Sequence, residues 1–357
     1  MKLITVVGAR PQFIKAAVLS RLLRQSAGVE ERLVHTGQHF DPAMSDVFFA
    51  ELDLPRPDYH LTVGSGSHAV QTAAMLTGVE EVLRAERPDA VLVYGDTNST
   101  LAGALAAAKL NLPIAHVEAG LRSFDRAMPE EVNRVLTDHL ARWLFCPTEA
   151  AVANLAREGI TERVYSVGDI MCDALLYYGR ERCPSPVLER LGLAVRPYAL
   201  CTLHRAGNTD DADRFGRLWS GLNRLAAELP VVLPLHPRSR KVIEAQRLAA
   251  GPGLHLTEPV GYREMLTLER QARLVVTDSG GVQKEAYLQG VPCLTLRDCT
   301  EWPETVAAGW NRLVGADEER LLGAARSYLL EGPPRQRPPL YGDGQAGRRI
   351  LNVLQAA

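Results

Sequence analysis

The sequence lacks the cysteine spacings that are typical of zinc sites and disulfide frameworks. Its six cysteines are scattered, and no two of them form a C-x-x-C pair. Several lie in apolar runs, which favours buried, reduced thiols in a cytosolic protein over zinc ligands or disulfides. Carboxylates and histidines at metal-ligand spacing are also missing, so we expect no metal. The G-x-G-x-x-G and Walker patterns are absent as well, so we expect no nicotinamide or other cofactor.

Excess charge of one sign and long apolar runs are absent too. The net charge is -2, with 23% charged and 46% hydrophobic residues, which is typical of an ordinary soluble globular protein. The sequence has no excess of basic residues, so its composition does not indicate a nucleic-acid surface. The longest apolar runs, such as 101–110, are too short for a membrane span, and the N-terminal segment "MKLITVVG" has no small-residue cleavage site. We therefore expect a cytoplasmic protein without nucleic-acid or membrane partners.

What the sequence does contain is a regular alternation of apolar runs and helical patterns. Near-continuous apolar strands between helices indicate parallel sheets that are covered on both faces. The predicted strands are 3–8, 32–35, 90–94, 113–117, 143–146, 164–167, 198–203, 231–235, 254–257, 273–277, 292–296 and 312–314. The predicted helices are 11–25, 67–85, 98–110, 130–141, 149–157, 211–228, 238–249, 262–271, 281–289, 317–330 and 346–356.

The fold class follows from the length and from the two series of strands. At 357 residues the chain favours two domains. Two series of about six strands fit two Rossmann-like halves better than one eight-stranded barrel. We predict an α/β fold with one Rossmann-like domain at 1–170 and a second at 188–345, joined by a linker within about 170–197 that contains Cys183-Pro184-Ser185-Pro186.

Charged residues follow the predicted strands of the first half, where open parallel sheets carry their reactive groups. Arg10 and Lys15 lie at the start of a helix, whose free N–H groups could hold an anion beside them. The alternative is that both are solvated surface charges. Asp96 follows the third strand and could belong to a functional site at the edge of the sheet. The alternative is that it caps a helix or faces solvent. Glu118 follows an apolar run, where a carboxylate is costly without a partner, so a functional role is favoured.

Two further acids, Glu130 and Glu131, open a predicted helix. Because the helix dipole favours acids at that end, this argument alone makes them structural caps. Counter-charge in the same region comes from Arg122, Arg126 and Arg134.

In the second half, two histidines follow strands at one predicted sheet edge. His204 and Arg205 follow the strand 198–203, and His236 follows 231–235. A single histidine at a strand end is as often structural as functional, but two at the same edge favour a binding or catalytic site.

The stretch "TDSGG" also joins a strand to a helix. Gly280 and Gly281 let a bulky anion approach backbone N–H groups, and Ser279 adds a hydroxyl donor. Glu285, further along the helix, could accept hydrogen bonds from ribose hydroxyls. A nucleoside diphosphate fits this pattern, whereas a plain strand-to-helix turn needs only one glycine.

Several motifs together resemble the non-hydrolysing UDP-N-acetylglucosamine 2-epimerase family. They occur in order along the chain: "GARPQFIKAA", "TGQHFD", "VYGDTNSTLAGALAA", "HVEAGLRS", "MPEEVNR", "LFCPT", "VGD", "LHRAGNTDD", "TDSGGVQKEA" and "YGDGQA". The resemblance implies the two-domain architecture of one large class of glycosyltransferases, with the active site in the interdomain cleft and a last helix, 346–357, packed on the first domain. It also implies a homodimer that interconverts UDP-N-acetylglucosamine and UDP-N-acetylmannosamine.

The resemblance also implies roles for individual residues. Its catalytic group would be Asp96, Glu118, Glu130 and His204. Its UDP-sugar-binding group would be Arg10, Lys15, Arg205, His236, Ser279, Gly280, Gly281 and Glu285.

Alternatives remain for the sugar and for the class of reaction. Family members that act on UDP-N-acetylglucosamine often read "TERPE", whereas this chain reads "TEWPE" at 300–304, which is more similar to relatives that epimerise UDP-2,3-diacetamido-2,3-dideoxy-glucuronate. A glycosyltransferase of the same fold, a hydrolysing epimerase and a non-catalytic UDP-sugar sensor are the rival interpretations.

Overall fold

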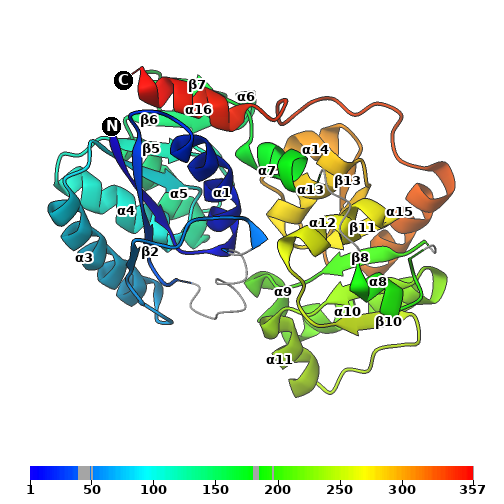
Figure 1. The fold of residues 1–357 in the computed structure, drawn as a ribbon. Coiled ribbons are helices and arrows are strands. Elements are labelled where there is room, and N and C mark those ends of the chain that lie inside the picture. The colour runs from blue at the N-terminus through cyan, green and yellow to red at the C-terminus, as the bar shows by residue number, and fades with distance from the viewer. Residues whose placement is uncertain (39–48, 50, 180–184, 195–196, 357) are drawn as a thin grey trace. The chain divides into compact units, whose positions relative to one another are not determined.

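A computed structural model describes residues 1–38, 49, 51–179, 185–194 and 197–356 (Figure 1). The contacts divide the chain into two compact units. Unit 1 comprises Met1–Tyr178 and Pro339–Ala357, and unit 2 comprises Gly179–Pro338. None of the helices in the described ranges combines the length and the apolarity that a membrane crossing needs.

Unit 1 is built on a parallel sheet with the strand order β3-β2-β1-β4-β5-β6-β7. Strand β1 lies inside the sheet, where Val6 pairs with Val34 on one side and with Val93 on the other. Successive strands are added first on one side of β1 and then on the other, which is the doubly wound arrangement. The strands are β1 Lys2–Val7, β2 Glu30–His35, β3 Tyr59–His60, β4 Ala90–Tyr94, β5 Ile114–Val117, β6 Trp143–Cys146 and β7 Val164–Ser166.

Helices cover both faces of this sheet. On one face, Val79 and Leu83 of α3 and Ala104 of α4 pack against strand residues such as Val6 and Val91. Helix α5 continues this layer beside α4, while α1, α7 and α16 contact one another (Figure 1). The helices of unit 1 are α1 Arg10–Arg24, α3 His68–Glu86, α4 Asn98–Lys109, α5 Pro129–Leu140, α6 Glu149–Arg157, α7 Ile170–Tyr178 and α16 Ala346–Gln355.

The last helix joins unit 1 through a carboxylate at its N-terminus. Asp173 of α7 accepts hydrogen bonds from the backbone N–H groups of Ala346 at 3.1 Å and Gly347 at 2.8 Å. These groups belong to the first turn of α16 and have no partner within the helix, so the carboxylate satisfies them and also matches the helix dipole.

Unit 2 repeats the same winding with the strand order β10-β9-β8-β11-β12-β13, again with parallel pairs. Its strands are β8 Ala199–Thr202, β9 Val231–Pro234, β10 Leu254–Thr257, β11 Leu274–Thr277, β12 Cys293–Thr295 and β13 Asn311–Leu313. Its helices are α8 Pro186–Arg190, α9 Ala206–Thr209, α10 Ala212–Glu228, α11 Pro237–Ala245, α12 Tyr262–Gln271, α13 Gly280–Gln289, α14 Pro303–Ala307 and α15 Glu318–Glu331.

Alternate residues of the unit 2 strands enter opposite cores. Leu274 and Val276 face a cluster with residues of α10 and α15, whereas Val275 faces a second cluster with residues of α8, α12 and α13. Because side chains alternate across a strand, a run that is apolar throughout fills both faces of its sheet.

The predicted fold class of two Rossmann-like α/β domains is confirmed. Strand β3 and the short helices α8, α9 and α14 are additional to the predicted elements. So is α7, which lies in the segment predicted as a linker and belongs to unit 1. Its sequence "IMCDALLYY" is apolar almost throughout, so it carries no 3.6-residue period. Cys183 and Pro184 of that segment lie outside the described residues.

The described cysteines are mostly buried thiols. Cys146, Cys172, Cys201 and Cys293 are buried and free, and Cys299 is free and exposed. Burial raises the pKa of Cys146 to about 12, so this thiol stays protonated at neutral pH.

Candidate active site

The charged residues of unit 1 gather where β1, β4 and β5 end. These three strands are neighbours in the sheet, and the direction of strand addition changes between β1 and β4. Ligands bind at such a switch point in open parallel sheets, beyond the carboxyl ends of the strands.

The turn between β1 and α1 is fixed by a glutamine that sequence reasoning did not single out. Gln12 Oε1 accepts hydrogen bonds from the N–H groups of Gly8 at 2.8 Å and Ala9 at 3.0 Å. Its Nε2 donates to the carbonyl of Tyr94 at 2.9 Å and to the hydroxyl of Thr100 at 3.0 Å. This buried side chain therefore joins the turn after β1 to the end of β4.

Lys15 and Glu118 form a buried ion pair at this edge. Their side chains are 8% and 10% exposed, so neither is the solvated surface charge that one interpretation allowed for Lys15. Glu118 has a φ of 73°, in the left-handed region that costs a non-glycine residue about 1–3 kcal/mol. Gly95 makes room for the pair, because a Cβ on it would lie 3.3 Å from Lys15 Nζ and 3.4 Å from Glu118 Oε2.

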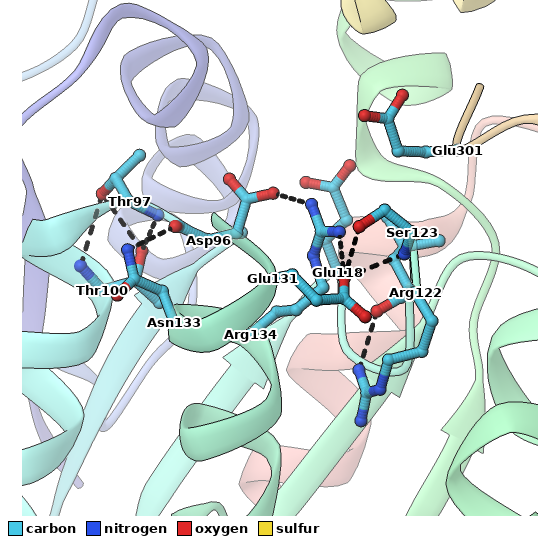
Figure 2. A network of polar contacts seen from close by, with 12 residues as sticks. Asp96, Thr97, Thr100, Glu118, Arg122, Ser123, Glu131, Asn133, Arg134 and Glu301 are labelled. Carbon is cyan, nitrogen blue, oxygen red and sulfur yellow. Dashed lines mark hydrogen bonds and ion pairs between the residues drawn. The ribbon is translucent and has the colours of Figure 1, made fainter. Parts of the chain in front are cut away.

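Asp96 is held by residues of helix α5 and does not act as a helix cap. Its carboxylate forms an ion pair with Arg134, and its carbonyl accepts a hydrogen bond from Asn133 Nδ2 at 2.9 Å. The Asp96 side chain remains one-third exposed. Figure 2 shows this chain of contacts, which continues from Arg134 to Glu131 and Ser123.

The two adjacent acids of α5 have different surroundings. Glu131 is buried, accepts hydrogen bonds from the N–H groups of Ser123 at 2.8 Å and Phe124 at 3.0 Å, and pairs with Arg134 at 2.7 Å. Although burial alone raises the pKa of Glu131, the Ser123 and Arg134 contacts lower it below its ordinary value. Glu130, the residue with a predicted catalytic role, is partly exposed in the first turn of α5. Glu131 therefore has the structural role that was expected for both.

A second polar network lies behind these carboxylates. His116 of β5 is fully buried, with Nδ1 2.7 Å from Asp138 Oδ1 and Nε2 2.7 Å from the carbonyl of Gly95. Asp138 also pairs with Arg122 at 2.7 Å, and Arg122 pairs with Glu158 at 2.7 Å. The sequence offered one signal for this network, namely a histidine inside an apolar strand.

In unit 2 a buried aspartate organises the turn after β8. Asp278 follows β11 and accepts hydrogen bonds from the N–H groups of His204 at 2.9 Å and Arg205 at 2.8 Å and from Asn208 Nδ2 at 3.2 Å. His204 Nδ1 lies 3.2 Å from the same carboxylate. Asp278 thus determines where the predicted catalytic histidine points, although sequence reasoning assigned it no role.

The two histidines of unit 2 lie together, as their positions after neighbouring strands predict. The rings of His204 and His236 stack with their centroids 5.2 Å apart. The His204 side chain is 32% exposed, and His236 begins α11, where its Nδ1 accepts from the N–H of Arg238 at 3.1 Å. Part of this pair is therefore accessible to a ligand.

Helix α13 begins where the glycines of "DSGG" predict an anion site. Ser279 is its N-cap, with a hydroxyl 3.5 Å from the N–H of Val282. A Cβ on Gly281 would contact only the Ser279 hydroxyl within 4 Å, so the space beside it is open. The first N–H groups of a helix lack intrahelical partners and attract anions. Glu285 lies further along α13 and is buried.

The segment after β12 places an aromatic ring next to this helix start. Trp302 is 4% exposed, and Lys284 Nζ lies 4.0 Å from the centre of its ring. Glu301 forms two contacts of 2.9 Å with Arg297, and although burial raises the pKa of Glu301, this pair lowers it below its ordinary value. A Cβ on Gly280 would lie 3.4 Å from Trp302 Nε1, so a side chain there would crowd the ring.

The arrangement can serve acid–base chemistry in unit 1 and anion binding in unit 2. Asp96 and Glu118 each have a cation beside them, and this cation stabilises the ionised carboxylate. The ionised carboxylate is the form that can accept a proton. In the described part of the chain, no group of three or more His, Cys, Asp or Glu side chains could hold a metal ion.

Comparisons with known proteins agree on one family. A family model described as UDP-N-acetylglucosamine 2-epimerase matches residues 21–355. The chain is 50% identical to the UDP-2,3-diacetamido-2,3-dideoxy-D-glucuronate 2-epimerase of Pseudomonas aeruginosa and 44% identical to the UDP-N-acetylglucosamine 2-epimerase of Methanocaldococcus jannaschii, in each case over 99% of both chains. A crystal structure of the M. jannaschii UDP-GlcNAc 2-epimerase in complex with UDP-GlcNAc and UDP matches with a TM-score of 0.92 and 43% identity, covering 100% of both chains.

Proposed function

The chain belongs to the UDP-N-acetylglucosamine 2-epimerase family, and we propose that it inverts C2 of a UDP-N-acetylhexosamine, interconverting UDP-N-acetylglucosamine and UDP-N-acetylmannosamine. One observation carries this proposal beyond family membership. The carboxylates of Asp96 and Glu118 lie at the ends of adjacent strands, each paired with a cation. An ionised carboxylate can serve as the general base that takes a proton from carbon.

Unit 2 would hold the uridine diphosphate. The N-terminus of α13, with Ser279, Gly280 and Gly281, offers N–H groups and open space to the phosphates, and Glu285 would accept hydrogen bonds from the ribose. The side chains Arg10, Lys15, Arg205 and His236 complete the predicted binding set.

The chemistry of the substrate explains why both groups of residues are needed. The hydrogen at C2 is not next to a carbonyl, so a base alone removes it poorly. When the bond from C1 to the phosphate oxygen breaks, its electron pair leaves with UDP, and the positive charge that develops at C1 acidifies C2–H. A carboxylate then takes the proton, and the C2–H electron pair forms the C1=C2 double bond of a glycal.

The return step inverts the centre. A proton is delivered to C2 on the opposite face, and the phosphate oxygen of UDP re-forms its bond to C1. Inversion therefore needs proton donors and acceptors on two faces of the ring. We assign this work to Asp96, Glu118, Glu130 and His204.

The test is to neutralise each carboxylate and to measure turnover and binding separately. Asp96→Asn and Glu118→Gln should each lower kcat at least a hundredfold, a typical acid–base contribution, while UDP still binds. The exposed Glu81→Gln on α3 is the matched control and should keep full activity. Wild-type turnover in both site variants would remove the role given to these carboxylates.

Two specific observations support UDP-2,3-diacetamido-2,3-dideoxy-glucuronate as the alternative substrate. Trp302 stands where many members that act on UDP-N-acetylglucosamine have arginine, and the 50% identical P. aeruginosa relative is named for UDP-2,3-diacetamido-2,3-dideoxy-D-glucuronate. Measuring kcat/KM for both sugar nucleotides with one enzyme preparation decides between them. We expect turnover of UDP-N-acetylglucosamine, and its absence at high enzyme concentration would assign the chain to the second sugar.

We further propose a homodimer formed by the layer of α3, α4 and α5, in a cytoplasm that keeps the thiols reduced. On this layer the side chains of Val70, Val132 and Leu136 are 64%, 41% and 46% exposed. The same layer of a second copy of the chain would bury them. Light scattering should give twice the chain mass of 39.1 kDa. Leu136→Glu should give the monomer mass, whereas Leu330→Glu, at an exposed leucine of unit 2, should leave the dimer intact.

A further inference from the structure

His116 faces hydrogen-bond acceptors on both sides of its ring. Asp138 Oδ1 lies 2.7 Å from Nδ1, and the carbonyl oxygen of Gly95 lies 2.7 Å from Nε2. A backbone carbonyl can only accept. A neutral imidazole has one donor nitrogen and one acceptor nitrogen, so it would point a lone pair at one of these oxygens. When Asp138 is ionised, both contacts are satisfied together only by the imidazolium form.

The contacts of Asp138 indicate that it is ionised. It accepts hydrogen bonds from the N–H of Gly120 at 3.0 Å and from Arg122 at 2.7 Å, and its Oδ1 lies 2.7 Å from His116 Nδ1. Burial raises the pKa of Asp138, but His116 and Arg122 outweigh this and lower it below its ordinary value. With His116 protonated the network is balanced in charge, because His116 and Arg122 match the anions Asp138 and Glu158, while the half-exposed His139 lies 3.3 Å from Glu158.

This network holds the two turns that carry the carboxylates of unit 1. Gly95 donates its N–H to the carbonyl of Val117 at 2.9 Å, and its own carbonyl is held by His116, so the residue before Asp96 is held at both its N–H and its carbonyl. Asp138 holds the N–H of Gly120, two residues after Glu118. A single buried pair thus connects the turn after β4 with the turn after β5.

We propose that His116 and Asp138 form a charged positioning pair, in which the His116 imidazolium fixes the Gly95 carbonyl and thereby aligns Asp96 and Glu118 for proton transfer. This inference rests on the proposed function for the reaction that is aligned. The pair does not touch the reacting atoms. A misplacement of about 1 Å far from the chemistry can lower a rate a hundredfold, so loss of the Gly95 contact reduces kcat more than it changes substrate binding.

Two variants separate positioning from simple packing. In His116→Asn the side-chain amide still reaches Asp138, but nothing donates to Gly95. The double variant combines His116→Gln with Asp138→Asn. Its asparagine side chain at position 138 donates a hydrogen bond to the side-chain oxygen of the glutamine at position 116. The side-chain amide group of that glutamine in turn donates to the Gly95 carbonyl. This restores the contact without charge, and Arg122 keeps its pair with Glu158. Thr137→Val, at the neighbouring residue of α5 with a buried hydroxyl, is the matched control.

We expect His116→Asn to lose at least tenfold in kcat, with KM within about threefold of wild type, and the double variant to recover to within about threefold of wild-type kcat. Thr137→Val should match wild type. Wild-type kcat in a folded His116→Asn variant, or a double variant no better than His116→Asn, would overturn the positioning role.

A substrate-free measurement tests the charge state separately. In protein labelled with ¹⁵N-histidine at pH 7.5, both ring nitrogens of His116 should carry protons, in a signal assigned by its loss in the double variant. A neutral His116 ring would overturn the inference whatever the enzyme turns over. If wild type converts no UDP-sugar but the ring is charged, the proposed function fails and the buried ion pair stands.

Discussion

At the scale of single residues, the placement of Glu118 is unusual and depends on one partner. It has a left-handed backbone and a buried carboxylate, and Lys15 from α1 neutralises it. Removing one member of a buried ion pair leaves the other charge without compensation, which typically costs about 3–5 kcal/mol.

Lys15→Met should therefore lower the free energy of unfolding by about 3–5 kcal/mol, measured by urea denaturation. The double variant Lys15→Met with Glu118→Gln should recover most of this loss, because no buried charge is left. Lys109→Met, at an exposed lysine of α4, is the control and should change stability by less than about 0.5 kcal/mol. An unchanged stability for Lys15→Met would mean that the pair is solvated.

Glu31 gives a pH-dependent prediction. Its pKa is raised from 4.5, mainly because burial disfavours the ionised form, and only partly offset by hydrogen bonds from Thr5 and Ser20. The folded state therefore holds this proton more tightly than the unfolded state. The resulting stability is complete below pH 4.5 and is lost as the pH rises through the folded-state pKa.

Replacing Glu31 with glutamine should remove this loss. The free energy of unfolding of Glu31→Gln should exceed that of wild type at pH 7.5, and the difference should shrink towards pH 4.5. Denaturation of both proteins across this range is the measurement. A difference that grows as the pH falls would have the wrong sign and would reject a raised pKa.

Much of the residue-level assignment was accessible from sequence, and its limits have physical reasons. A carboxylate after an apolar strand needs a partner, and Glu118 has one in Lys15. The dipole argument could not separate Glu130 from Glu131, because both fit it and only the fold brings Ser123 and Phe124 to Glu131. The contact of Gln12 with Tyr94 and that of Asp138 with His116 join residues 82 and 22 positions apart, which no local pattern encodes.

At the scale of elements, the beginning of α13 is the feature most open to a separate test. Gly281 lies in the first turn, and a Cβ there enters open space. Alanine is favoured over glycine in helices by up to about 1 kcal/mol, so the fold should tolerate or gain from the change. The added methyl group would occupy the space that the phosphates of UDP would otherwise use.

Gly281→Ala should therefore keep or raise the melting temperature while lowering UDP affinity at least tenfold in calorimetric titrations. Gly323→Ala on α15, where a Cβ would meet no described residue within 4 Å, should show the same effect on stability and none on UDP binding. Equal UDP affinity in the two variants would place the phosphates elsewhere.

Long helices with clear periods were predicted well, whereas short or uniformly apolar helices were not. The strands of both sheets other than β3 were expected within a few residues, and several of them, such as β4, β6 and β9, are continuous apolar runs. Helix α9 has four residues and depends on the Asp278 contacts to the turn before it. Helix α7 is buried on most sides against α1 and α16, so it lacks the polar stripe that marks a surface helix.

At the scale of the whole molecule, the two units are variations of one design. In both, strands are added on one side of the first strand and then on the other, and the groups with proposed roles follow the strands beside that change of direction. This is why the alternation of strands and helices was sufficient to predict the fold class, and why residues after strand ends were the right ones to inspect.

The central claim is that the enzyme breaks and re-forms the bond between UDP and the sugar while the hydrogen at C2 is exchanged. Incubation of the wild-type protein with UDP-N-acetylglucosamine in heavy water, followed by NMR at C2, tests it most directly. We expect deuterium at C2 of both epimers with the sugar still joined to UDP at equilibrium. Recovery of the nucleotide sugar with its C2 hydrogen intact, or release of free sugar in step with UDP, would contradict it.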